Sequence, residues 1–167
     1  MKKIVASLFF AVTDMLASLT ACGSETARDT EMIKEPVEAE ENAEKTTEDS
    51  TMKITAGDIT FTATLADNSS VEAWKKLLAE GPLTIHMSDY AGMEKVGPIG
   101  TSLPRNDEQI SAGAGDIILY QGSSLVIYYD TNSWDFTRIG KIEGVTGEEL
   151  LEAFGDGDVT VTFSLES

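Results

Sequence analysis

The stretch at residues 115–129, GDIILYQGSSLVIYY, decides the fold. Two apolar runs, at 116–120 and 124–129, flank Gly122 and Ser123, which are residue types typical of tight turns between antiparallel strands. The runs are almost continuously apolar, as in strands that are covered on both faces. The sequence therefore predicts a β-hairpin in the middle of a sheet.

The flanking sequence predicts further strands and two helices. Alternation of apolar and polar residues predicts strands at 52–56, 59–65, 83–87, 136–142 and 159–165. In the strand at 59–65, Ile59, Phe61 and Leu65 are expected to face the core.

The first predicted helix is capped by Asn68, Ser69 or Ser70 and ends at residues 81–82, Gly-Pro. The second begins with a capping box, Thr146 with Glu149, and ends at Gly155.

A long loop is predicted at residues 89–115, because this segment holds five glycines and two prolines. Only 93–96 and 99–103 are candidates for short extended segments. Loops of this length within a compact domain tend to be functional. The whole order, about eight strands and two short helices in residues 52–167, predicts a mainly β fold, a closed barrel with helices over its openings.

The charge of the chain excludes several partners. Its 167 residues hold 29 Asp and Glu against 12 Lys and Arg, a formal net charge of −17. Nucleic acids are not expected as partners, because their binding needs clustered basic residues. The single cysteine excludes an intramolecular disulfide and any site built from several thiolates. No cofactor fingerprint occurs, and the sequence predicts neither a metal site nor a cofactor.

Residues 1–21 are predicted to be a lipoprotein signal peptide. Lys2 and Lys3 precede a short apolar run, as in secretory signals. Residues 19–22, Leu-Thr-Ala-Cys, resemble the lipobox of bacterial lipoproteins, in which the cysteine is lipidated and the chain is cut just before it. This resemblance implies a lipid on Cys22 and a protein anchored to the cell membrane on its extracytoplasmic face.

Residues 22–51 are predicted to form a disordered acidic linker behind the lipidated Cys22. Residues 23–51 carry ten acidic residues against three basic ones and no aromatic residue. Such a segment offers too little apolar surface to fold. The folded domain is then predicted at 52–167.

Several short motifs in this domain resemble a known family. They are Asp-Tyr at 89–90, Gly-Pro-Ile-Gly at 97–100, Leu-Pro at 103–104, Gly-Asp-Ile at 115–117, Leu-Tyr at 119–120, Ser-Trp at 133–134 and Ile-Gly-Lys-Ile at 139–142. In this order they resemble the small bacterial cyclophilin-like domain, which is often found in lipoproteins. The order of strands and helices is also similar to that of cyclophilins.

The resemblance to cyclophilins implies prolyl isomerisation as one possible activity. That reaction needs an apolar pocket for the proline ring and a fixed arginine that stabilises the twisted amide. The Phe-His-Arg and Gln-Gly-Gly-Asp segments of the enzymes do not occur in this chain. The candidate arginine is Arg105, since Arg138 lies on a predicted strand and is expected to point to solvent.

The predicted binding groove borders the 89–115 loop and contains Tyr90, Met93, Arg105 and Trp134. Trp134 is placed in a predicted loop at 132–135, and Tyr129 and Phe136 are further aromatic candidates. The sequence favours a lipoprotein whose barrel binds a peptide or small ligand without catalysis. The alternative is an extracytoplasmic peptidyl-prolyl cis-trans isomerase.

Overall fold

The computed structural model describes residues 50–166. The predicted signal peptide at 1–21, the lipidation site Cys22 and all but the last two residues of the predicted linker lie outside these residues. The elements follow in the order β1 (Thr51–Ala56), β2 (Ile59–Leu65), α1 (Ser69–Ala79), β3 (Leu83–Tyr90), β4 (Glu94–Pro98), β5 (Glu108–Ala112), β6 (Asp116–Tyr120), β7 (Ser124–Tyr128), β8 (Asn132–Ile142), α2 (Gly147–Phe154) and β9 (Val159–Leu165).

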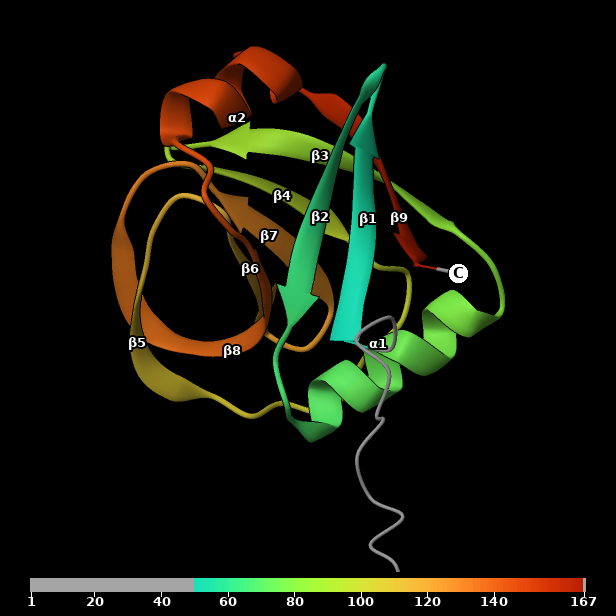
Figure 1. Ribbon diagram of the computed structural model, residues 1–167. Helices are drawn as coiled ribbons and strands as arrows, with labels where there is room; N and C mark the ends of the chain where they lie inside the picture. The colour runs from blue at the N-terminus through green and yellow to red at the C-terminus, as the bar shows by residue number, and fades with distance from the viewer. Residues whose placement is uncertain (1–49, 167) are drawn as a thin grey trace, which may run out of the picture. The chain divides into compact units, whose positions relative to one another are not determined.

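Eight of the nine strands close into a ring (Figure 1). The order around it is β2-β1-β9-β3-β4-β7-β6-β8, and the pairing of β2 with β8 closes it. Neighbouring strands are antiparallel throughout. The mainly β, closed eight-stranded barrel with two short helices is therefore confirmed, with the predicted hairpin forming β6 and β7. Neither helix of the described residues is long and apolar enough to cross a membrane.

The barrel interior is the main hydrophobic core, and the two helices cover its openings (Figure 1). Trp74 of α1 is fully buried and meets Phe163 of β9 edge to face, with ring centroids 5.7 Å apart. Phe154 of α2 meets Phe61 of β2 at 5.9 Å. Both predicted helix starts are confirmed, because the Asn68 side chain caps α1 and the capping box of Thr146 begins α2.

A buried polar cluster lies inside the barrel at the end covered by the loop between α2 and β9. The Lys95 side chain is fully buried, and its Nζ donates at 2.8 Å to both Asp89 Oδ1 and the Gly157 carbonyl. The Tyr129 hydroxyl donates to the same Asp89 oxygen at 2.6 Å. These hydrogen bonds connect β3, β4, the end of β7 and the loop before β9. Tyr129 therefore belongs to the interior and not to an external groove.

The segment at 89–115 differs from the predicted loop. It contains the end of β3, all of β4 and all of β5, whereas residues 99–103 form no strand. The strand β5, with sequence EQISA, is held by its pairing with β8. The sequence of β5 alone does not predict a strand. The prediction that Ile59 faces the core is also wrong, because it sits at the β1–β2 turn and is 42% exposed.

β8 changes partners along its length, and this change positions the outer pocket. Its second half pairs with β6 and β2 in the barrel wall, while its first half, 132–136, pairs with β5. The predicted loop at 132–135 is therefore strand. The resulting β5–β8 ribbon packs against the outer face of β6 and β7 and forms a second hydrophobic cluster of Ala112, Ile118, Val126, Tyr128 and Phe136.

Candidate ligand-binding pocket

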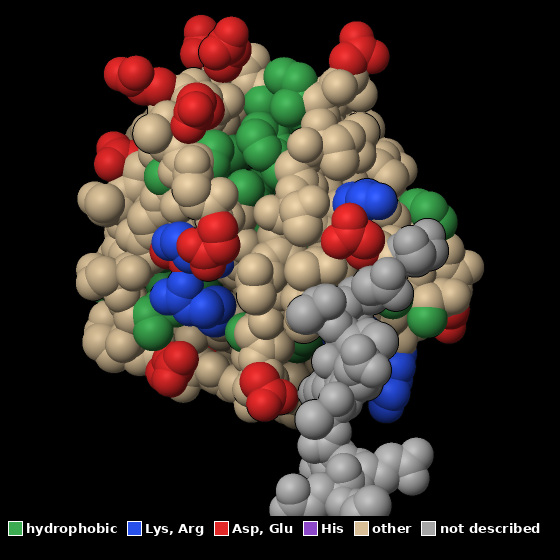
Figure 2. Space-filling model, in the orientation of Figure 1, with side chains coloured by type: hydrophobic (Ala, Val, Ile, Leu, Met, Phe, Trp, Pro, Cys, Tyr) green, Lys and Arg blue, Asp and Glu red, His purple; other side chains and the backbone are tan. Residues whose placement is uncertain are grey.

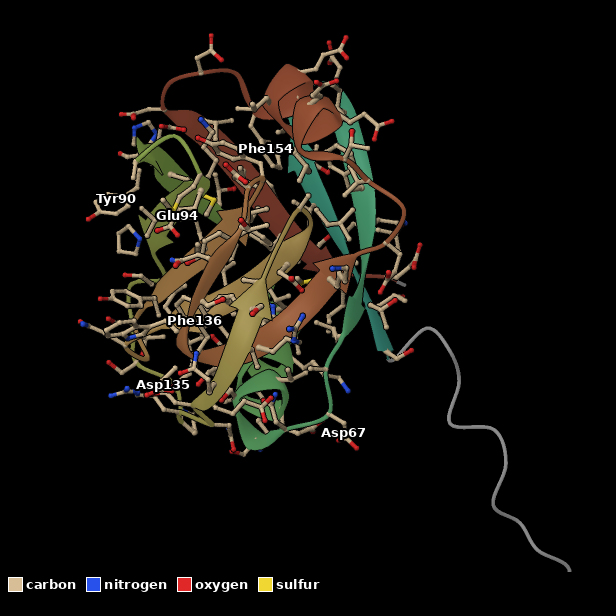
Figure 3. The ribbon with its side chains drawn as sticks, turned by 90° about the vertical axis from the view of Figure 1, so that its left-hand side faces the viewer. Asp67, Tyr90, Glu94, Asp135, Phe136 and Phe154 are labelled. Atoms are coloured by element: carbon tan, nitrogen blue, oxygen red, sulfur yellow. The ribbon has the colours of Figure 1, made fainter. Side chains whose placement is uncertain are left out.

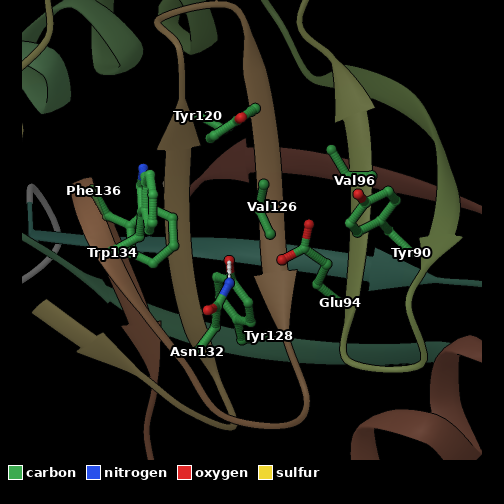
Figure 4. A pocket seen from close by; sticks show the side chains of 9 residues that line it. All are labelled: Tyr90, Glu94, Val96, Tyr120, Val126, Tyr128, Asn132, Trp134 and Phe136. Atoms are coloured by element: carbon green, nitrogen blue, oxygen red, sulfur yellow. Dashed lines mark hydrogen bonds between the residues drawn. The ribbon is translucent and has the colours of Figure 1, made fainter.

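A pocket of about 350 Å³ opens on the outer face of the barrel (Figure 4). It is bounded by β4, β7 and β6 and by the first half of β8, with the end of β3 at its edge. Figure 3 shows Tyr90, Glu94 and Phe136 along one side of the barrel, away from Phe154 of α2. Nine residues line the pocket: Tyr90, Glu94, Val96, Tyr120, Val126, Tyr128, Asn132, Trp134 and Phe136.

Strand alternation explains how these residues reach the outer face. On β7, Leu125 and Ile127 belong to the interior core, so Val126 and Tyr128 project outward. On β4, the buried Lys95 points inward, and Glu94 and Val96 therefore point into the pocket. The floor of the pocket is thus the reverse side of the strands that form the core.

Exposed aromatic rings form the rim of the pocket. Four large apolar side chains of residues 50–166 are exposed, and three of them, Tyr90, Tyr120 and Trp134, line this one pocket. Tyr90 is 61% exposed and Trp134 is 64% exposed. Clustered exposed aromatic side chains around a concavity are typical of binding sites and not of an inert surface.

The polar groups of the pocket lie next to one another. Asn132 Nδ2 donates to the Tyr128 hydroxyl at 3.1 Å, and the Glu94 carboxylate interacts with the same hydroxyl. Glu94 and Tyr128 are direct cross-strand partners. Burial raises the pKa of Glu94, and burial together with the neighbouring Glu94 raises the pKa of Tyr128.

The four residues predicted for the groove divide into two pairs. Tyr90 and Trp134 lie together at the pocket. Met93 is partly buried against the outer cluster and does not line the pocket. The Arg105 side chain is 56% exposed and forms an ion pair with Asp107, and its aliphatic part lies beside Gly122 in the β6–β7 turn. No arginine is among the lining residues.

The candidate Arg138 and the one histidine of the chain, His86, lie elsewhere on the barrel. Arg138, which was expected to point to solvent, instead forms an ion pair with the buried Asp116 of β6. His86 is at the surface of β3, where its Nε2 lies 3.7 Å from Asp158 Oδ2. Within residues 50–166, no three His, Cys, Asp or Glu side chains are grouped so as to hold a metal ion.

Sequence reasoning missed most of the pocket lining, including Glu94, Tyr120 and Tyr128. One signal pointed to Tyr120 and Tyr128: after their first residue the strands β6 and β7 are apolar or aromatic at every position, so both faces of these strands need a cover. One cover is the barrel interior, and the other is the ribbon that bears Trp134 and Phe136. The sequence does not indicate which segment supplies that ribbon.

Comparison with known proteins identifies the family of the barrel. Residues 54–164 match the model of the Cyclophilin-like family. No curated protein matches the chain. The matched segment comprises both helices and nearly all of the eight-stranded ring, so the family assignment and the observed fold agree. The chain belongs to the Cyclophilin-like family.

Proposed function

We propose that the domain is a ligand-binding module that holds an apolar group, from a small molecule or a peptide side chain, in the outer pocket. The observation that carries the proposal is the convergence of Tyr90, Tyr120 and Trp134 on one concavity. A volume of about 350 Å³ suits a small ligand or one or two side chains.

Binding is favoured over prolyl isomerisation because the pocket has no arginine. The isomerase reaction needs a fixed donor beside the prolyl nitrogen, inside the site. Arg105 is engaged with Asp107 outside the lining residues, and Arg138 with Asp116. The pocket therefore offers apolar walls and a carboxylate but lacks the cationic donor for that transition state.

Trp134→Ala is expected to weaken binding of the neutral fluorescent probe N-phenyl-1-naphthylamine by about tenfold or more, since loss of an aromatic anchor costs about 1.4 kcal/mol or more. The measurement is a fluorescence titration of the purified full chain. Ile59→Ala is the matched control, because Ile59 is also exposed but does not line the pocket. It should bind as the wild type does.

Two outcomes would contradict this proposal. Equal probe affinity in the wild type and in Trp134→Ala would show that the pocket is not the binding site. Rapid turnover in a proline-peptide isomerisation assay, abolished by Arg105→Ala, would instead favour the isomerase.

We further propose that Cys22 carries a lipid that anchors the protein to the extracytoplasmic face of the cell membrane. The support is the lipobox-like segment at 19–22 after a basic and apolar leader. Cys22→Ser is expected to move the protein from the membrane fraction to the soluble fraction. Ser24→Ala is the control, and this variant should stay in the membrane fraction. Retention of Cys22→Ser in the membrane fraction would argue against lipid anchoring at this residue.

A further inference from the structure

We propose that the ligand of the outer pocket carries an alkylammonium group, held between the aromatic rings with its positive charge facing Glu94. This inference rests on the ligand-binding function proposed above and specifies the chemistry of the ligand. The inference is argued from three observations: the Glu94 carboxylate has no cationic partner, aromatic side chains surround it, and the domain is acidic.

Glu94 is an acidic group without a cationic partner. The residue is only 8% exposed, and it is the one charged residue among the nine that line the pocket. Every other charged side chain that is buried in residues 50–166, namely Lys95 and Asp116, forms an ion pair, whereas no ion pair involves Glu94. The polar group that interacts with its carboxylate is the Tyr128 hydroxyl.

An isolated buried carboxylate costs free energy that a ligand cation would offset. Removing a carboxylate from water is unfavourable unless an opposite charge or several donors compensate it. The raised pKa of Glu94 is a sign of that cost. A positive charge placed beside the carboxylate would favour its ionised form. The attraction would offset the desolvation cost and so contribute to the binding free energy.

The aromatic rings around Glu94 favour an alkylated cation over a strongly hydrated one. Figure 4 shows Trp134 and Phe136 on one side of the carboxylate, Tyr90 on the other and Tyr128 below it. Aromatic faces attract cations within about 6 Å, and cages of such rings recognise quaternary ammonium groups. Val96 and Val126 add apolar surface for the alkyl groups. The lining thus supplies both dispersion contacts and negative potential.

The remaining ligand classes fit less well. An anion would meet Glu94 and a domain that holds eighteen acidic against seven basic residues in 52–167. Acidic side chains are also the more prominent charges on the barrel face in Figure 2. A neutral group such as a proline ring would fill the apolar walls and leave the carboxylate without a counter-charge. A cation also gains from long-range attraction by the acidic domain.

The test compares choline with 3,3-dimethylbutan-1-ol, which has the same shape but no charge. Displacement of N-phenyl-1-naphthylamine from the full chain gives both affinities. We expect choline to bind at least tenfold more tightly than the alcohol. Glu94→Gln, which keeps the side-chain shape, should remove this preference, so that choline and the alcohol bind within about twofold of each other. Asp135→Asn is the matched control, because Asp135 is an exposed acid near the pocket that does not line it.

A second pair of probes identifies the source of the cation. N-acetyl-lysine methylamide and its norleucine counterpart differ only in the ammonium group. A Glu94-dependent preference for the lysine compound points to a peptide, and a preference confined to choline points to a small molecule; either outcome supports the cationic ligand.

The failures of this inference and of the binding proposal are distinguishable. If the neutral probe binds at Trp134 but neither charged compound is preferred, the cationic ligand is overturned and the binding module stands. If Glu94→Gln leaves the preference for choline intact, Glu94 does not bind the ammonium group and the inference fails. If neither the neutral probe nor choline binds, both proposals fail.

Discussion

Replacing Lys95 by alanine is expected to lower the free energy of unfolding by about 3–5 kcal/mol. The Lys95 side chain is fully buried and is hydrogen-bonded to both Asp89 and the Gly157 carbonyl. The substitution removes the cation from a charged pair and also leaves a cavity where the aliphatic chain packed. Urea unfolding followed by circular dichroism measures the change.

Two variants show whether the loss comes from this buried cluster. Lys53→Ala is the matched control, because Lys53 is a strand lysine paired with Glu166, yet its side chain is 43% exposed. Exposed pairs contribute little, so its effect should stay below about 1 kcal/mol. Lys95→Met refills the cavity without the charge and should lose less than Lys95→Ala. Equal losses from Lys53→Ala and Lys95→Ala would contradict the role given to the buried pair.

The acid side of the stability profile gives a second readout of the same cluster. The hydrogen bonds from Lys95 and Tyr129 hold the pKa of Asp89 below its ordinary value of 3.8. The stabilisation is therefore complete above the pKa of the unfolded chain and is lost as the pH falls through the lower, folded value. Lys95→Met removes the largest cause of the shift, so its stability should fall less steeply in acid.

Trp74→Ala is expected to destabilise the barrel by about 3–5 kcal/mol, the usual cost of truncating a buried tryptophan. Trp74 closes one opening of the barrel, is fully buried and packs on Phe163. Its indole N–H also donates to Met52 Sδ at 3.3 Å. Thermal unfolding of the variant measures the loss.

The chain contains a natural control in its other tryptophan. Trp134 is 64% exposed at the pocket rim, so Trp134→Ala should change the free energy of unfolding by less than about 0.5 kcal/mol. A comparable loss from both substitutions would mean that α1 does not close the barrel as described. A stable Trp134→Ala also ensures that its effect on probe binding reports the pocket and not unfolding.

The sequence predicts the barrel well because most of its strands bury one face only. Alternation at 52–56, 59–65 and 159–165 marks strands that correspond closely to β1, β2 and β9. The helix caps at Asn68 and Thr146 depend on hydrogen bonds between residues close in sequence, so the sequence predicts them equally well. Where the signal is a local period or a local hydrogen bond, sequence and structure agree.

The pocket is less predictable because it depends on contacts between distant segments. Tyr90 and Trp134 lie 44 positions apart in the sequence, and the β5–β8 ribbon joins residues 108–112 to 132–136. The sequence EQISA of β5 has neither strong alternation nor a long apolar run. Glu94 resembles any surface acid until the fold places it beside Tyr128. No local pattern reports such a placement.

The position of β9 sets the order in which the barrel can form. β9 follows all the other strands of residues 50–166 in sequence and lies between β1 and β3, pairing with both. Until β9 pairs with them, β1 and β3 are therefore not joined, and each has one edge without a partner strand. Pairings of such high sequence separation slow folding because loop-closure entropy is lost before the contacts form. The barrel is thus expected to close in one late folding step, in which β9 pairs with β1 and β3 together.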